Sequence, residues 1–185
     1  MTQRVLLVML LFYSFMALAA DTVLKLYRPF NRDDGQQLLI HKQINGECSG
    51  QSKLILREDA WSCQADGQIY DPCFIKSGPN QMSLLCPNSP WSNENVQINV
   101  ASPLSNEEHQ VLDMSRTYPW AIELTNGDHC QAIELGESYD SMPVRYHCSG
   151  ENRLVGTIQR CNPVWSMLEK TPDGVVTREL KQAWF

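Results

Sequence analysis

Apolar and polar residues alternate over short stretches through most of the chain, as they do in half-buried β-strands. Turn sequences rich in Gly, Asn, Asp and Pro separate these stretches, among them 33–35, 45–46, 78–80 and 126–128. The alternation predicts strands at residues 22–27, 37–43, 52–56, 96–101, 121–124 and 144–148. It also predicts a hairpin near the end of the chain, in which 164–169 pairs with 175–180 across 171–174 and Trp184 anchors the end.

One short helix is predicted between Pro103 and Pro119. Ser105-Asn106-Glu107-Glu108 has the Ser-x-x-Glu form of a capping box, and apolar Val111 and Leu112 follow it. The two prolines limit the helix to about three turns.

The predicted fold class is therefore all-β or β-rich α+β: a small antiparallel barrel or sandwich with one short helix, held by disulfides. Pro90-Trp91 and Pro119-Trp120 each precede a strand-like stretch, which is a weak sign of two similar halves. We expect a single domain over residues 20–185.

The first residues have the pattern of a secretory signal peptide. Arg4 supplies a positive charge, residues 5–16 are apolar except for Ser14, and Ala17-Leu18-Ala19 fits the small-x-small cleavage rule. The apolar run is shorter than the ~20 residues of a transmembrane helix. We expect residues 1–19 to be removed, rather than kept as an N-terminal anchor. The mature chain is then a secreted or periplasmic bacterial protein without a membrane attachment.

The charge argues against nucleic acid as a partner. The full chain has a formal charge of −6, from 15 basic and 21 acidic residues, and loss of Arg4 makes it −7 (14 − 21). No run of Lys or Arg forms a basic patch in the sequence, so neither nucleic acid nor an anionic surface is an expected partner.

The seven cysteines favour an oxidising compartment. Neighbouring cysteines divide naturally into Cys48 with Cys63, Cys73 with Cys86, and Cys130 with Cys148. We expect this local pairing, although six cysteines allow about 15 connectivities. Each bridge would close a short loop and contribute about 3 kcal/mol in the chain-entropy model.

Cys161 is then left without a partner. It is expected to be a buried, inert thiol, an intermolecular bridge that makes a dimer, or a thiolate activated by neighbouring Arg160. The chain is otherwise expected to be a monomer.

No metal or other cofactor is predicted. His129-Cys130 and His147-Cys148 supply metal-ligating groups, but adjacent side chains of a strand point to opposite faces, so neither pair aims both groups at one ion. The Gly-x-Ser-x-Gly, His-Glu-x-x-His, Ser-x-x-Lys and Cys-x-x-Cys signatures of common enzymes do not occur.

The aromatic residues are the better indication of a binding function. Five tryptophans are many for a chain of this size, and two of them follow proline in predicted loops. Tryptophans on loops bind sugars, peptides or protein partners, and they also close the ends of small β cores. We hypothesise that Tyr70 and Trp91 flank a binding groove, with Trp120 as a further binding residue.

Several short sequence motifs of this chain occur in the same order in a known family. They are Asp59-Ala60-Trp61-Ser62-Cys63, then 69–74 (IYDPCF), 86–91 (CPNSPW) and 119–124 (PWAIEL), and finally Ala183-Trp184. Over roughly residues 46–185 the chain resembles a family of exported, cysteine-rich bacterial proteins of no established function. The resemblance implies the same three disulfides, because the family pattern has those six cysteines and lacks Cys161. It implies no reaction or substrate.

Together these observations predict an exported, non-catalytic binding domain for an envelope component or a protein partner. The alternative is a small secreted hydrolase with an acidic or His-Asp site, which a pocket containing His129, His147 and an aspartate would favour. A third interpretation is a purely structural or inhibitory module.

Overall fold

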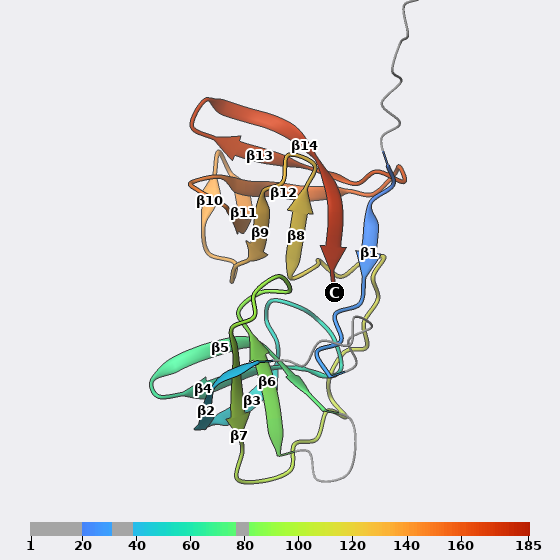
Figure 1. The fold of residues 1–185 in the computed structure, drawn as a ribbon. Helices are drawn as coiled ribbons and strands as arrows, with labels where there is room; N and C mark the ends of the chain where they lie inside the picture. The colour runs from blue at the N-terminus through green and yellow to red at the C-terminus, as the bar shows by residue number, and fades with distance from the viewer. Residues whose placement is uncertain (1–19, 31–38, 77–81) are drawn as a thin grey trace, which may run out of the picture.

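The computed structural model describes residues 20–30, 39–76 and 82–185. Within these ranges the regular secondary structure consists of β-strands, without an α-helix (Figure 1). The predicted signal peptide and the predicted turns at 33–35 and 78–80 lie outside the described residues. A search of the described ranges for a helix that could cross a membrane finds none.

The first sheet has six strands in the order β2-β7-β6-β5-β4-β3. All neighbours are antiparallel except β2 and β7. The strands are β2 (Ile40–Asn45), β3 (Glu47–Gln51), β4 (Ala60–Ala65), β5 (Gln68–Ile75), β6 (Ser83–Pro87) and β7 (Asn95–Asn99). Only Gly46 separates β2 from β3, so one continuous stretch borders both β7 and β4 and closes the sheet. We call β2–β7 the N-terminal barrel.

The second sheet closes through antiparallel pairing of its last strand with its first. Its ring consists of β8 (Ala121–Leu124), β9 (His129–Ala132), β11 (Met142–Cys148), β12 (Arg153–Gln159), β13 (Ser166–Thr171) and β14 (Gly174–Trp184). Short β10 (Ser138–Tyr139) pairs with β11, and β1 (Val23–Lys25) runs parallel to β14. We call this ring the C-terminal barrel. The predicted β13–β14 hairpin is confirmed, with Thr171 opposite Gly174.

Each disulfide joins directly opposed residues of neighbouring strands inside one barrel. Cys48–Cys63 and Cys73–Cys86 lie in the core of the N-terminal barrel, and Cys130–Cys148 lies in the core of the C-terminal barrel. The predicted local pairing and the all-β, disulfide-bonded barrel are therefore confirmed. The three bridges indicate an oxidising, extracytoplasmic environment.

The predicted helix after Pro103 is wrong, because this segment forms turns that pack on the N-terminal barrel. The Asn106 side chain donates to the backbone oxygen of Glu58 at 3.0 Å, and the Leu112 amide donates to the Glu58 carboxylate at 3.0 Å. The His109 ring packs on Trp61, with 4.3 Å between ring centroids. Contacts with residues about fifty positions earlier therefore satisfy polar groups that a helix would have paired locally.

The predicted strand at 52–56 is also wrong. Ser52 is buried, and its Oγ accepts hydrogen bonds from the amides of Leu54 at 3.1 Å and Ile55 at 3.0 Å. A serine side chain that bonds the following amides turns the backbone out of an extended path. The segment is consequently a loop between β3 and β4.

The two barrels lie one above the other and share a third apolar cluster (Figure 1). Tyr27 lies at its centre, with ring centroids 5.3 Å from Phe74 of the N-terminal barrel and 5.2 Å from Trp120, which immediately precedes β8. Ala183 and Phe185, at the end of β14, complete its contact with the C-terminal barrel.

Arg57 adds polar contacts to this apolar interface. Its side chain lies in the loop before β4, is 5% exposed as a residue, and covers the Phe74 ring at 4.9 Å. Nη1 donates to the backbone oxygens of Tyr27 at 2.6 Å and Phe185 at 3.0 Å. Nε and Nη2 pair with the two carboxylate oxygens of Asp59 at 2.6 and 2.7 Å. One guanidinium thus joins the N-terminal barrel, the segment after β1 and the end of β14.

Gly46 is expected to be essential for closing the N-terminal barrel. A Cβ at this position would lie 2.7 Å from the Gln64 backbone oxygen and 2.8 Å from the Ala65 Cβ. Gly46→Ala should therefore cost about 1–3 kcal/mol of unfolding free energy, as overpacking does. Gly50→Ala is the matched control, because a Cβ there meets nothing within 4 Å. Equal urea midpoints for the two variants would contradict this account.

We expect Arg57→Met to destabilise the protein by about 3 kcal/mol or more, because Asp59 and two backbone oxygens lose a charged partner. We also expect the two barrels of the wild type to unfold together, so that tryptophan fluorescence and far-ultraviolet circular dichroism give the same urea midpoint. In Arg57→Met the two methods should give different midpoints, because the barrels unfold separately. Arg28→Met, at an exposed position, controls for the loss of a positive charge. A single, unshifted transition in Arg57→Met would show that the guanidinium does not hold the barrels together.

Candidate functional site

A groove of about 440 Å³ opens at one end of the N-terminal barrel. Strand register brings the beginnings of β2 and β7 to the end of β6, because Asn95 pairs with both Ile40 and Pro87. The beginning of β5 lies at the same end, since β5 runs antiparallel to β6. The groove is lined by His41, residues 68–71, residues 86–88 and residues 94–96.

Tyr70 supplies the aromatic surface of the groove. Its ring packs partly against the core of the N-terminal barrel, and its hydroxyl donates to the Gln68 side-chain oxygen at 3.2 Å. Tyr70 lies opposite Cys63, which is bonded to Cys48, so the β-strand that carries the ring is tied to its neighbour. The hypothesis that Tyr70 flanks a groove agrees with this placement.

Asp71 lies beside Tyr70 and is held in one position by hydrogen bonds. Its carboxylate accepts from the Ser52 hydroxyl and from the Lys53 amide, the latter at 2.9 Å. Burial raises the pKa of Asp71, and the hydrogen bonds from Ser52 and Lys53 oppose that shift. The peptide bond between Asp71 and Pro72 is cis. The sequence alone did not distinguish Asp71 from the other acidic residues. Pro72 after it is the one local sign of an unusual backbone conformation.

Asn95 connects the strands at the floor of the groove. It is 1% exposed, and its Nδ2 donates to the backbone oxygens of Leu39 and Asn93, each at 3.1 Å. Its Oδ1 has no hydrogen-bond donor within the described residues. Asn95, Glu94 and His41 carried no signal in the sequence, because only strand pairing brings them together.

The charges that line the groove are mainly negative. Asp71 and Glu94 contribute carboxylates, and His41 is the one basic side chain among the lining residues. Carboxylate and amide oxygens accept hydrogen bonds from hydroxyl groups and from cationic donors. The groove therefore suits a hydroxyl-rich or cationic ligand that also packs against an aromatic ring.

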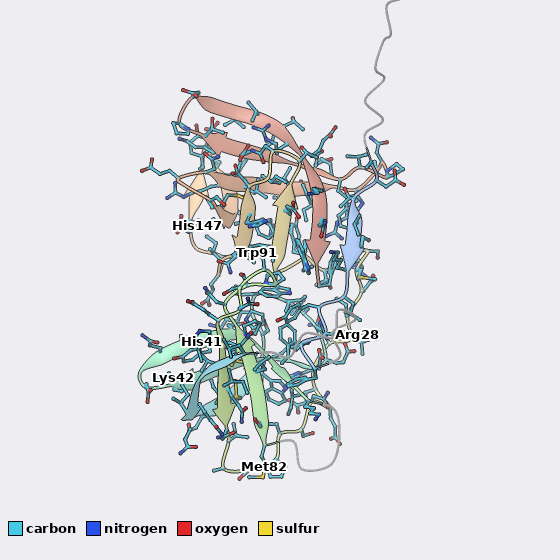
Figure 2. The ribbon with its side chains drawn as sticks, viewed as in Figure 1. Arg28, His41, Lys42, Met82, Trp91 and His147 are labelled. Carbon is cyan, nitrogen blue, oxygen red and sulfur yellow. A yellow bond between two sulfur atoms is a disulfide. The ribbon has the colours of Figure 1, made fainter. Side chains whose placement is uncertain are left out.

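Trp91 lies on the loop between β6 and β7, but its ring faces the C-terminal barrel. It stacks on His129, with centroids 4.2 Å apart and 18° between planes, and meets Trp184 edge-on at 5.4 Å. Figure 2 shows Trp91 between the barrels, away from His41 on the N-terminal barrel. Trp91 is therefore adjacent to the groove in the chain without lining it.

The expectation that Trp120 presents a binding surface is wrong. Trp120 is 2% exposed and packs against both Tyr27 and Phe74 in the cluster that the barrels share. This burial agrees with the other interpretation of the tryptophans, in which they close the ends of a small β core.

The histidines and Cys161 do not gather into a second site. His147 Nε2 lies 3.2 Å from a Glu137 carboxylate oxygen, whereas His129 stacks on Trp91, and neither histidine lines the groove. A search of the described part of the chain finds no group of three or more potential metal ligands. Cys161 is exposed, so its interpretation as a buried thiol is wrong.

The raised pKa of Asp71 predicts a pH-dependent loss of stability. The ordinary pKa of an aspartate in an unfolded chain is about 3.9. The folded state therefore binds a proton more readily, and the Asp71 contribution to stability falls as pH rises from about 3.9 through the raised pKa. The unfolding free energy of Asp71→Asn minus that of the wild type should therefore increase over this pH range. Any further effect of the substitution adds a difference that does not change with pH. Urea titrations at a series of pH values measure it, and a pH-independent difference would contradict it.

Comparison with known proteins gives no relative from which a function can be taken. No protein-family model, curated protein or solved structure matches the chain. The resemblance to exported cysteine-rich bacterial proteins accordingly stays a prediction.

Proposed function

We propose that this chain is an exported, non-catalytic binding domain that holds an envelope component, or part of a protein partner, in the groove beside Tyr70. The groove carries this proposal, since it combines an aromatic face, carboxylates and amides in about 440 Å³. Small-molecule sites commonly have about 300–1,000 Å³ and a few polar groups among apolar ones. Apolar Ile69, Pro87 and Val96 supply the remaining surface.

The rigidity of the groove walls supports a role in binding. Cys73–Cys86 joins β5 and β6, which both contribute residues to the groove, and Asn95 joins β7 to the residue before β2. A preformed site loses little conformational entropy when a ligand binds, so modest contacts suffice for measurable affinity. The disulfides also fit the proposed secreted or periplasmic location in a bacterium.

The ligand class that fits best is an amino sugar of the cell envelope. Its ring hydroxyls would donate to the Glu94 carboxylate, and its apolar face would pack on Tyr70. Asp71 and the Asn88 backbone oxygen, which already accept hydrogen bonds within the protein, would each accept a further one through a remaining lone pair. A free amine would add a charged contact with the carboxylates.

Tyr70→Ala should abolish binding of the trisaccharide of glucosamine, while the folded state survives because Tyr70 is only partly buried. Isothermal titration calorimetry with this trisaccharide and with its N-acetylated form measures both the loss and the contribution of the amine. Tyr139→Ala is the matched control, since Tyr139 is exposed on the C-terminal barrel. Unchanged binding in Tyr70→Ala would sink the proposal for this groove, and binding of the protein to neither sugar would leave a protein partner as the ligand class.

One observation favours a second candidate, a hydrolase that uses Asp71 as its acid. A carboxyl group with a raised pKa in a groove is a common feature of general acids. Against this role, both Asp71 oxygens already accept hydrogen bonds from Ser52 and Lys53. Cleavage of either trisaccharide by wild type, and its loss in Asp71→Asn, would replace the binding function with the hydrolase.

A further inference from the structure

A second cleft, of about 180 Å³, lies where the two barrels meet, outside the groove beside Tyr70. The loop between β3 and β4 forms one wall with Leu54 and Leu56. The residues after β9 form another, with Ile133 and Leu135. Leu56 is 40% exposed and Leu135 is 62% exposed, so both present apolar surface to the cleft from outside the core.

The charged residues that line this cleft are all cations: Lys53, Arg116 and Arg145. Lys53 Nζ pairs with Glu134 at 2.6 Å, which offsets its charge. Within the described ranges neither Arg116 nor Arg145 has a carboxylate within 4 Å. Asp113 interacts with Arg116 at longer range. Two guanidinium groups therefore face the cleft without a direct acidic partner, in a chain whose formal charge is −6.

Arg145 is held in place for such a role. Its Nε donates to the Gly156 backbone oxygen at 2.7 Å, and its guanidinium lies 4.0 Å from the centre of the Tyr118 ring. The buried Tyr146 hydroxyl donates to the Pro119 backbone oxygen at 2.7 Å and fixes the floor beside it. A guanidinium that is already oriented loses little side-chain entropy when it binds a carboxylate.

The size of the cleft limits its occupant. Water occupies about 30 Å³ per molecule in the liquid, so 180 Å³ is room for roughly six waters or for one or two side chains. This volume is below the ~300 Å³ at which small-molecule sites begin, and it is too small for a lipid chain. The arrangement of two guanidinium groups beside exposed leucines matches an acidic side chain flanked by apolar ones.

We infer that the cleft between the barrels docks an acidic peptide segment of a protein partner, with a Glu or Asp carboxylate between Arg116 and Arg145 and neighbouring apolar side chains on Leu56 and Leu135. This interaction is separate from ligand binding in the groove beside Tyr70 and does not depend on it.

Amide chemical shifts of the whole mature protein test the inference with two peptides, acetyl-Gly-Leu-Glu-Leu-Gly-amide and its Gln counterpart. At low salt the Glu peptide should bind about tenfold more tightly, since a hydrogen bond to a charged group contributes more than a neutral one. The shifts should fall on residues 53–56, 116–118 and 145–146, and added salt should weaken the binding.

Arg116→Gln should reduce the affinity for the Glu peptide to that for the Gln peptide. The fold should survive, because the Arg116 side chain makes no hydrogen bond or ion pair among the described residues. Arg153→Gln is the control, since Arg153 lies on β12 and faces Glu137 at 3.7 Å. Equal affinities for the two peptides, shifts confined to the groove, or an unaffected Arg116→Gln variant would each overturn the inference.

Discussion

A charged side chain buried between two barrels is the interaction on which the arrangement of this molecule depends. Moving a guanidinium out of water is costly unless its donors are satisfied, and Arg57 satisfies them with Asp59 and with the backbone oxygens of Tyr27 and Phe185. These acceptors belong to three separate parts of the chain, so the guanidinium makes all of its contacts only when all three are in place. The Phe74 ring covers the guanidinium and packs in turn against Tyr27 and Trp120, so these contacts are made in a largely buried setting, which strengthens them. Burial of the apolar cluster stabilises the interface between the barrels, and the directional contacts of Arg57 fix the geometry of that interface.

Within each barrel, closure and the disulfides solve the same physical problem. A small β-sheet has few apolar residues with which to stabilise itself, and its unpaired edge strands invite aggregation. The N-terminal barrel removes its edges because Gly46 lets one stretch of chain border both β4 and β7. The C-terminal barrel does so because β14 is long enough to pair with β13 and then with β8. Disulfides between opposed strands then add stability inside cores that are small.

The groove and the cleft have opposite electrostatics, which follows from the segments that form them. Asp71 and Glu94 line the open end of one barrel, whereas Arg116 and Arg145 lie where loops of one barrel approach the sheet of the other. The two proposed sites therefore differ in ligand class, hydroxyl-rich or cationic groups for the groove and a carboxylate for the cleft. Both sites lie next to strands that a disulfide ties to a neighbour, Cys73–Cys86 beside the groove and Cys130–Cys148 beside the cleft, so their geometry is largely preformed.

The sequence by itself determined the properties that depend on residues near one another in the chain. The alternation of apolar and polar residues predicted β8 and most of β7 and β11, and turn residues predicted the β13–β14 hairpin. The disulfide pairs were predicted because neighbouring cysteines close short loops. The hypothesis that Tyr70 and Trp91 flank a groove agrees with the placement of Tyr70 only, because Trp91 packs against the C-terminal barrel. The tertiary structure alone decided what depends on distant contacts. Glu58 and Trp61 hold the segment after Pro103 in turns instead of a helix. Trp120 is buried because it meets Phe74 of the N-terminal barrel and Tyr27 of the segment after β1. Asn95, Arg116 and Arg145 come to line the groove and the cleft only through strand pairing and barrel contact, for which no local pattern of residues gives a signal.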